Sequence, residues 1–351
     1  MTGLRFDPQV CMTCETRDCI RRCQYVRLDR ERAGEEIGKI LRGEDSILLT
    51  ECVTCFACEE YCPRRNHPFY RIAELQESKG LYTAPRPIIH QQIRMCTPRA
   101  APVVLGRLGN PVFSLCIFPD ALERLRGPLF AGASHLLGLG AFCNLVYLHF
   151  ARPSVTRERM PHIVRNIGAI LEGAGLNRLI CFHDECYAAF TSWAPAYGIE
   201  TPFQAGHLFH YLVEELRSHR HAVTPLGVKA AYQRPCSNRL IPETEPVLDE
   251  LFALIGVERV RRAHDREGAL CCGSVFRMMG RDGLADEVQE RNVEDMAGAG
   301  ARYCVFNCPM CYYTLAEGVT KKGMIPVMVT DLCLMALGDT GPTPKTPGLS
   351  G

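Results

Sequence analysis

Eight cysteines stand in two short runs near the start of the chain. The first run has the spacing C-x2-C-x4-C-x3-C, and the second has C-x2-C-x2-C-x3-C followed by Pro63. They are Cys11, Cys14, Cys19 and Cys23, then Cys52, Cys55, Cys58 and Cys62. Thiolates returned about every third residue can surround a cubane cluster. Because a four-cysteine zinc site usually has two separated C-x2-C pairs instead, the runs predict two [4Fe–4S] clusters.

The second run has the spacing of bacterial ferredoxins, in which the fourth cysteine usually binds the other cluster. The first run is looser, since its middle interval is longer and Gln24 stands where proline is usual. We therefore expect an exchange of fourth ligands. One cluster would be held by Cys11, Cys14, Cys19 and Cys62, and the other by Cys52, Cys55, Cys58 and Cys23.

A further set of cysteines lies in the C-terminal part of the chain. A single cysteine is followed by a Cys-Cys-Gly triplet and then by Cys-Pro-Met-Cys; the five are Cys236, Cys271, Cys272, Cys308 and Cys311. Adjacent cysteines before Gly273 can direct two thiolates at one site, and a C-x2-C pair at a helix start adds two more. Buried structural thiols are the alternative for each cysteine alone. Their combination with the first two runs favours another cluster.

These five positions resemble the CCG cysteine-rich domain of heterodisulfide reductase catalytic subunits, which also occurs in the iron–sulfur subunits of glycerol-3-phosphate and glycolate dehydrogenases. The ferredoxin runs match the fused architecture of the same superfamily, so the resemblance covers nearly the whole chain. It implies that the five cysteines bind a [4Fe–4S] cluster of the non-cubane type.

The chain is also similar to the CCG subunits of membrane redox complexes in sulfate-reducing bacteria. That similarity implies other redox subunits as partners, including a membrane haem or quinone-reactive subunit. It also implies a cytoplasmic location. Peripheral attachment to the inner face of a membrane, through a partner, stays open.

The composition of the chain divides it into segments. Residues 1–80 are charged and predict an α-helical dicluster ferredoxin-like domain, whereas residues 81–111 are rich in Pro, Gly and Arg and predict a linker. Residues 112–340 alternate apolar strand-like runs (VFSLCIF, NLVYLHF, RLICFH, VKAAYQ and RYCVFN) with helical stretches, which is typical of α/β layers with parallel strands. Residues 341–351 predict a disordered tail.

The α/β region contains an internal repeat. The segments RNIGAILEGAGLNRLICFHDECYAAF and RNVEDMAGAGARYCVFNCPMCYYTL each suggest a helix opened by Arg-Asn and closed by Gly-Ala-Gly, then a strand and a cysteine-bearing turn. One offset (298 − 173 = 125) pairs Gly173 with Gly298, His183 with Cys308, and Cys186 with Cys311. We expect two pseudo-symmetric CCG half-domains, a degenerate one at 112–222 and an intact one at 223–340.

The first half-domain has no CCG triplet, and His183 stands where the second has Cys308. Its remaining cysteines are Cys116, Cys143, Cys181 and Cys186. Three readings stay open: a scaffold without a cluster, which the lost spacing favours; a smaller or different metal centre held by these cysteines with His183; or proton supply to the second half by His183, Asp184 and Glu185. His183 is the candidate catalytic proton donor, because its unperturbed pKa lies near neutrality.

The balance of 40 Lys+Arg against 39 Asp+Glu gives no reason to expect a nucleic-acid partner. No apolar run is long enough to predict a transmembrane segment or a signal peptide, so the 20 cysteines indicate thiolates kept for metal in a reducing compartment. No G-x-G-x-x-G supports NAD or flavin binding. Arg234 and Arg239 flank Cys236 and could attract an anionic substrate, unless they are solvated surface residues.

The expected function is that of an iron–sulfur oxidoreductase subunit. Electrons would pass through two cubanes to the CCG-bound cluster, where a disulfide, a quinone or a partner redox protein is reduced or oxidised. A pure electron-carrier or docking subunit without its own substrate site is the first alternative. A zinc-stabilised interaction protein is the second.

Overall fold

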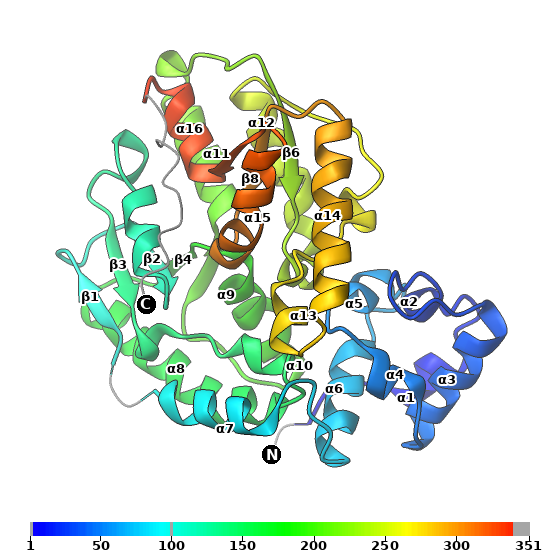
Figure 1. The fold of residues 1–351 in the computed structure, drawn as a ribbon. Coiled ribbons are helices and arrows are strands. Elements are labelled where there is room, and N and C mark those ends of the chain that lie inside the picture. The colour runs from blue at the N-terminus through cyan, green and yellow to red at the C-terminus, as the bar shows by residue number, and fades with distance from the viewer. Residues whose placement is uncertain (1–2, 99–100, 340–351) are drawn as a thin grey trace.

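The N-terminal region is a set of short helices with the two cysteine runs in the turns between them. In the computed structural model, which describes residues 3–98 and 101–339, this region forms a lobe beside the larger α/β part (Figure 1). Its helices are α1 (Pro8–Met12), α2 (Asp18–Arg21), α3 (Arg30–Arg42), α4 (Ile47–Glu51), α5 (Ala57–Tyr61) and α6 (Pro68–Ser78). The charged segment between the two cysteine runs forms α3, and the Asp29 side chain caps it by accepting from Arg32 N at 2.9 Å.

The segment 81–111 is more than the linker that its composition predicts. It contains α7 (Arg86–Met95) and β1 (Val103–Leu105). Strand β1 pairs antiparallel with β3 (Ser134–Leu137), so this segment supplies an edge of the first sheet.

The first sheet has the strand order β1-β3-β2-β4-β5, and every pair except β1 with β3 is parallel. Its other strands are β2 (Val112–Cys116), β4 (Arg178–Cys181) and β5 (Gln204–His207). The helices of this half are α8 (Pro153–Gly173), α9 (Asp184–Ala188), α10 (Ala194–Ala196) and α11 (Leu208–Ser218).

The second sheet has the order β7-β6-β8-β9, and all its pairs are parallel. Its strands are β6 (Val228–Gln233), β7 (Val257–Arg259), β8 (Tyr303–Phe306) and β9 (Ile325–Met328). The helices of this half are α12 (Glu245–Leu254), α13 (Ser274–Met278), α14 (Asp282–Gly298), α15 (Pro309–Lys321) and α16 (Val329–Ala336). Two parallel-rich sheets with flanking helices confirm the predicted α/β class (Figure 1).

Two local predictions are wrong. The run Asn144–Phe150, predicted as a strand, forms the short 3-10 helix Leu145–Leu148, because a buried run of this length does not distinguish strand from helix. The Arg-Asn pairs at 165 and 291 lie inside α8 and α14 rather than at their starts. The predicted tail at 341–351 lies outside the described residues.

One apolar core joins the two sheets. Phe113 of β2 and Ile180 of β4 belong to the same buried cluster as Tyr232 of β6 and Phe306 of β8. A second cluster packs Phe56 and Phe69 of the N-terminal lobe against the first half. Within the described residues, no helix is both long and apolar enough to cross a membrane.

Candidate metal centres

The five cysteines of the CCG pattern sit where strands end and helices begin. Cys236 starts a 3-10 turn after β6, and Cys271 and Cys272 precede α13. Cys308 is the N-cap residue of α15, which places Cys311 in the first turn of that helix. Gly273 has φ +82°, and a Cβ there would lie 2.9 Å from Gln289 Nε2 and 3.2 Å from the Ala285 carbonyl. The turn therefore needs a glycine both for its backbone conformation and for its close packing.

The five thiols form a continuous chain of contacts, in which Cys271, Cys272 and Cys311 are buried and Cys236 and Cys308 are partly buried. Hydrogen-bond contacts join Cys236 to Cys271, Cys271 to Cys272, Cys272 to Cys311, and Cys311 to Cys308. The contact with Cys236 raises the pKa of Cys271, and the contact with Cys272 raises the pKa of Cys311, with burial adding to both. So many buried sulfurs in contact fit a polynuclear cationic centre, because metal binding replaces their protons.

A histidine that the sequence analysis did not single out connects this centre to the ferredoxin loop. His149 Nε2 lies 3.8 Å from Cys236 Sγ, and His149 Nδ1 lies 2.8 Å from Thr54 Oγ1. Thr54 stands between Cys52 and Cys55. Burial lowers the pKa of His149 to about 4, so its imidazole is neutral near pH 7. Only the folded chain reveals this role, since His149 and Cys236 are 87 residues apart.

The ferredoxin cysteines form two groups. Asn66 donates its backbone N–H to Cys62 Sγ at 3.4 Å and its Nδ2 to Cys11 Sγ at 3.1 Å, so the fourth cysteine of the second run faces the first run. Burial is the largest cause of the raised pKa of Cys19, and the nearby charges of Cys62 and Cys11 raise it further.

Cys23 has the complementary position beside the second run. Burial is the largest cause that raises the pKa of Cys55 to about 12, and the charge of Cys23 is the second. A small apolar cavity is lined by Cys52, Cys55 and Cys58 of the second run and by both Cys19 and Cys23 of the first. The positions of these sulfurs around one cavity fit a cluster bound between the two runs.

The N-terminal lobe is held against the CCG turn by a buried ionic contact. Glu60 accepts from Arg234 Nη1 at 2.9 Å and from Arg239 Nη1 at 2.8 Å. The side chains of Arg234 and Arg239 are 1% and 4% exposed. The interpretation as solvated surface arginines is therefore wrong, and both charges already have a carboxylate partner. Tyr25 Oη also accepts from the Cys271 backbone N–H at 3.2 Å, which adds a contact between the lobe and the CCG turn.

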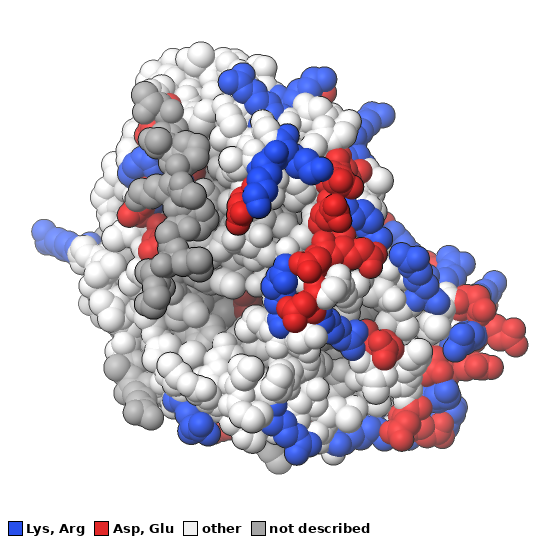
Figure 2. Space-filling model, viewed as in Figure 1, with Lys and Arg blue, Asp and Glu red and all other residues white. Residues whose placement is uncertain are grey.

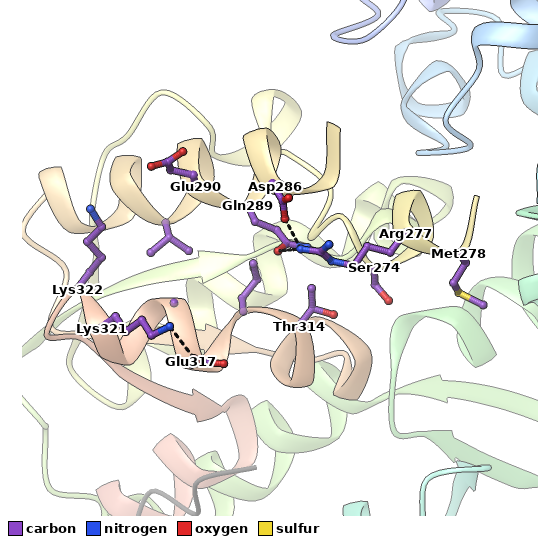
Figure 3. A pocket seen from close by; sticks show the side chains of 13 residues that line it. Ser274, Arg277, Met278, Asp286, Gln289, Glu290, Thr314, Glu317, Lys321 and Lys322 are labelled. Atoms are coloured by element: carbon purple, nitrogen blue, oxygen red, sulfur yellow. Dashed lines mark hydrogen bonds and ion pairs between the residues drawn. The ribbon is translucent and has the colours of Figure 1, made fainter. Parts of the chain in front are cut away.

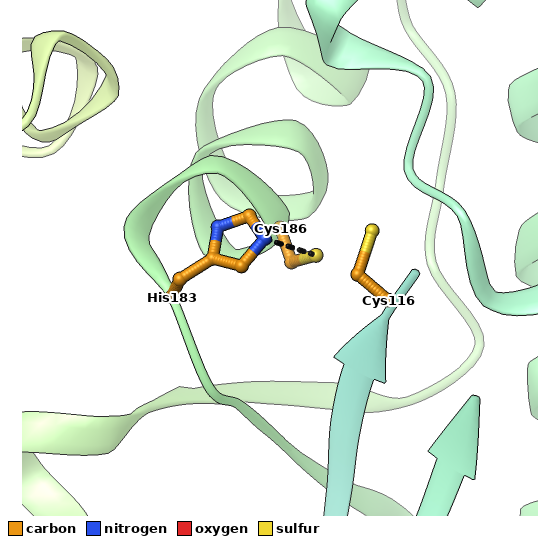
Figure 4. Close-up of side chains that lie close together, drawn as sticks. All are labelled: Cys116, His183 and Cys186. Carbon is orange, nitrogen blue, oxygen red and sulfur yellow. Dashed lines mark hydrogen bonds between the residues drawn. The ribbon is translucent and has the colours of Figure 1, made fainter. Parts of the chain in front are cut away.

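The degenerate half brings most of its cysteines together. Cys116 at the end of β2, and His183 and Cys186 at the start of α9, have ligand atoms that all lie within 4.8 Å of one another (Figure 4). Cys143 contacts both Cys116 and Cys186. Cys181, which was grouped with these residues from the sequence, is buried on β4 and has no part in these contacts.

His183 is buried, with 1% of its surface exposed. Its Nδ1 accepts from Glu185 N at 3.1 Å, and its Nε2 lies 3.8 Å from Cys186 Sγ. Although burial alone would lower it, the contact with Cys116 raises the pKa of His183 to about 9.

Asp184 joins the two halves beside both sets of cysteines. Its carboxylate accepts from Asn238 Nδ2 at 2.6 Å and from Asn307 Nδ2 at 2.7 Å, and it lies 3.3 Å from His207 Nε2. Asn238 follows Cys236 by two residues, and Asn307 immediately precedes Cys308. The turn after β4 thus holds two of the loops that carry CCG cysteines.

An open pocket of about 730 Å³ lies on the outer side of α13, α14 and α15, and no cysteine lines it (Figure 3). Most of its charged side chains are engaged in ion pairs, such as Arg277 with Asp286, and Lys321 with Glu317 at 2.6 Å. Charges of both signs also gather over α14 and the N-terminal lobe on the face shown in Figure 2. Neither feature suggests a site for a strongly charged polymer.

Comparison with known proteins supports the chemistry of the second half. Residues 230–316 match the family model CCG, described as "Cysteine-rich domain", which supports a CCG-domain iron–sulfur protein. No curated protein matches the chain. A solved structure titled "Crystal structure of a hypothetical protein from Helicobacter pylori" matches with a TM-score of 0.55 and 12% identity. The match covers 89% of this chain and 65% of that chain, and it shows a shared fold alone.

Proposed function

We propose that this protein is an iron–sulfur oxidoreductase subunit with two [4Fe–4S] clusters in its N-terminal lobe and a third, non-cubane [4Fe–4S] cluster at the CCG cysteines. The observation that carries the proposal is the convergence of Cys236, Cys271, Cys272, Cys308 and Cys311 in one chain of contacts. When bound, such clusters accept and release single electrons.

The contacts of the lobe support the proposed exchange of fourth ligands. Asn66 bonds to sulfurs of both runs, at Cys11 and at Cys62, and Cys23 is an electrostatic neighbour of Cys52 and Cys55. We assign Cys11, Cys14, Cys19 and Cys62 to one cluster and Cys23, Cys52, Cys55 and Cys58 to the other.

The second group lies beside the CCG cysteines. Thr54 reaches Cys236 through His149, and Tyr25 is an electrostatic neighbour of both Cys55 and Cys271. These contacts connect the two sites through packed side chains. They support an order of clusters in which the one assigned to Cys23, Cys52, Cys55 and Cys58 is next to the CCG site. The cluster assigned to Cys11, Cys14, Cys19 and Cys62 lies farther from it.

The two α/β parts are proposed to be related halves. The order β3-β2-β4-β5 in the first sheet parallels β7-β6-β8-β9 in the second, with all these pairs parallel. In both, a cysteine lies at or after the end of the corresponding strand, since Cys116 is the last residue of β2 and Cys236 comes soon after β6. This order supports domains at 112–222 and 223–340 behind the lobe at 1–80.

The reaction at the CCG site is proposed to be the reduction or oxidation of a disulfide, a quinone or a partner redox protein. Other redox subunits are the proposed partners, with a membrane haem or quinone-reactive subunit among them. A cytoplasmic location with peripheral attachment through such a partner belongs to the same proposal. The carrier alternative differs only in lacking a substrate site of its own.

The test is the variant Cys272→Ser, with Cys304→Ser as its matched control. Both cysteines are buried in the second half, but Cys304 contacts Met296 Sδ and lies outside the CCG chain of contacts. After anaerobic reconstitution, iron should fall from about twelve to about eight per chain in Cys272→Ser, with both ferredoxin-type EPR signals kept. Cys304→Ser should keep about twelve. Iron near eight in the unaltered protein would remove the CCG cluster from the proposal.

A further inference from the structure

We propose that His149 donates a hydrogen bond to the sulfur of Cys236 and thereby raises the reduction potential of the cluster at the CCG site. This inference rests on the proposed function, because it requires a cluster at the CCG cysteines. His149 Nε2 lies 3.8 Å from Cys236 Sγ, which is within reach of a hydrogen bond to sulfur. The histidine follows the short 3-10 helix Leu145–Leu148, so the first half supplies a polar group to the cysteines of the second.

The ring of His149 is buried and held in one orientation. Its Nδ1 lies 2.8 Å from Thr54 Oγ1, and its centroid lies 4.5 Å from that of the Phe56 ring. Thr83 Oγ1 donates to the His149 carbonyl, which also fixes the backbone at this position. Since Thr54 and Phe56 both belong to the second ferredoxin run, the N-terminal lobe orients a side chain that acts on the CCG site.

Thr54 makes this contact at a cost to the backbone. It has φ +56°, a left-handed conformation that is unfavourable for a β-branched residue. Its backbone N–H donates to Cys52 Sγ at 3.4 Å, while its hydroxyl reaches the ring of His149. One strained and fully buried residue therefore bonds both to a proposed cluster ligand of the lobe and to the histidine beside Cys236.

The direction of these hydrogen bonds follows from the chemistry of a metal-bound cysteine. Such a cysteine is a thiolate and has no proton to donate, so Nε2 of His149 carries the ring proton and donates it to Cys236 Sγ. A neutral imidazole has a single N–H, which leaves Nδ1 as an acceptor. The hydroxyl of Thr54 can donate to Nδ1, and it then holds the ring in the tautomer that the sulfur requires.

A hydrogen bond to a ligand sulfur changes the reduction potential of a cluster. Reduction adds negative charge, part of which lies on the sulfurs, so an N–H directed at Cys236 stabilises the reduced state more than the oxidised one. The potential at the CCG site is therefore higher with His149 in place. This makes the CCG site a better acceptor for electrons that arrive from the lobe. His149 acts through Cys236 and is a positioning residue, not a catalytic one.

The first test is an anaerobic redox titration of the full-length protein, followed by EPR, with His135→Leu as the matched control. His135 is also buried, but it stacks on Phe113 outside the cysteine sites. His149→Leu should lower the potential at the CCG site by about 59 mV, which corresponds to a tenfold change in a one-electron equilibrium. His149→Gln can return an N–H to the sulfur and should keep most of the potential, and Thr54→Val should give a smaller decrease. All variants should keep about twelve iron atoms, and the control should keep its potential.

The second test is pulsed EPR of protein that contains histidine labelled with a nitrogen isotope. The signal of the CCG site should show a weakly coupled nitrogen that is lost in His149→Leu. A strongly coupled nitrogen would make His149 an iron ligand and overturn the proposal, as would iron near eight in His149→Leu alone. A potential in His149→Leu equal to that of His135→Leu would overturn it as well, with the proposed function intact. Iron near eight in the unaltered protein would instead overturn the proposed function and this inference together.

Discussion

Replacing Glu60 by glutamine tests whether the buried ionic contact secures the N-terminal lobe against the CCG turn. The Glu60 side chain is 9% exposed and accepts from two arginines, Arg234 at 2.9 Å and Arg239 at 2.8 Å. Glutamine keeps the shape but removes the charge and turns an amide N–H₂ toward a guanidinium. Both arginines would stay buried without their shared carboxylate.

The expected loss follows from this burial. Removing one partner of a buried ion pair costs about 3–5 kcal/mol. The lower end applies here, because Arg234 also donates to Asn238 Oδ1 at 2.7 Å and Arg239 to the Ala269 carbonyl at 2.6 Å. With an unfolding entropy of about 2.1 cal/mol/K per residue, a chain of 351 residues loses about 4 °C of melting temperature for 3 kcal/mol.

The assay is anaerobic thermal unfolding at equal iron content and one scan rate, followed by circular dichroism and by the visible absorption of the clusters. Glu267→Gln is the matched control at the same interface, because the Glu267 and Arg22 side chains that pair there are 60% and 41% exposed. That exposed pair contributes about 0–1 kcal/mol, so the control should shift by about 1 °C or less. A shift in Glu60→Gln no larger than in the control would refute the reasoning.

Further predictions concern the ligand exchange, the histidine bridge and the glycine turn. Cys62→Ser should disturb the cluster of the first run and Cys23→Ser that of the second, by EPR; loss of only the variant's own cluster would contradict the exchange. His149→Phe should keep iron near twelve but cost about 1–3 kcal/mol and slow electron transfer between the lobe and the CCG site in flash photolysis; unchanged kinetics would exclude the bridge. Gly273→Ala should lose the CCG cluster, whereas Gly323→Ala, with φ +79° and no neighbour within 4 Å of its Cβ, should lose only stability, by about 1 kcal/mol.

The sequence predicts the parts of the fold that have strong local signals. The apolar runs that became β2, β4, β6 and β8 are central strands, buried on both faces, so they read as continuous hydrophobic segments. Strands such as β5 (Gln204–His207) were missed, because a four-residue strand with polar and glycine residues has no such pattern.

The candidate sites show the same limit. Spacing within short motifs indicates the ferredoxin runs, the Cys-Cys-Gly triplet and the Cys-Pro-Met-Cys pair as candidate ligand sets, since the cysteines of each motif are close in the chain. Long-range partners could not be found in this way: Glu60 and Arg234 are 174 residues apart, and Thr54 and His149 are 95 apart. The contact of Cys116 with Cys143 and Cys186 depends on how β2, β4 and the loop after β3 meet, which no spacing rule describes.

The connection between the two halves gives one more prediction, centred on Asp184. This buried carboxylate accepts from the Nδ2 atoms of Asn238 and Asn307, whose neighbours Cys236 and Cys308 are predicted ligands of the CCG cluster. Asp184→Asn keeps the volume but offers an amide where two amides already donate, at a cost of about 1–3 kcal/mol for each donor left unpaired.

Because both donors stand on ligand loops, Asp184→Asn should lose CCG iron, to about eight per chain, as well as stability. The matched control is Asp331→Asn. Asp331 is equally buried and accepts from Arg124 at 2.6 Å, but it lies at the start of α16, away from the CCG cysteines. It should lose stability and keep about twelve iron atoms. If both variants keep about twelve iron atoms, the Asp184 carboxylate does not position the CCG cysteines. It would then contribute to the stability of the fold alone.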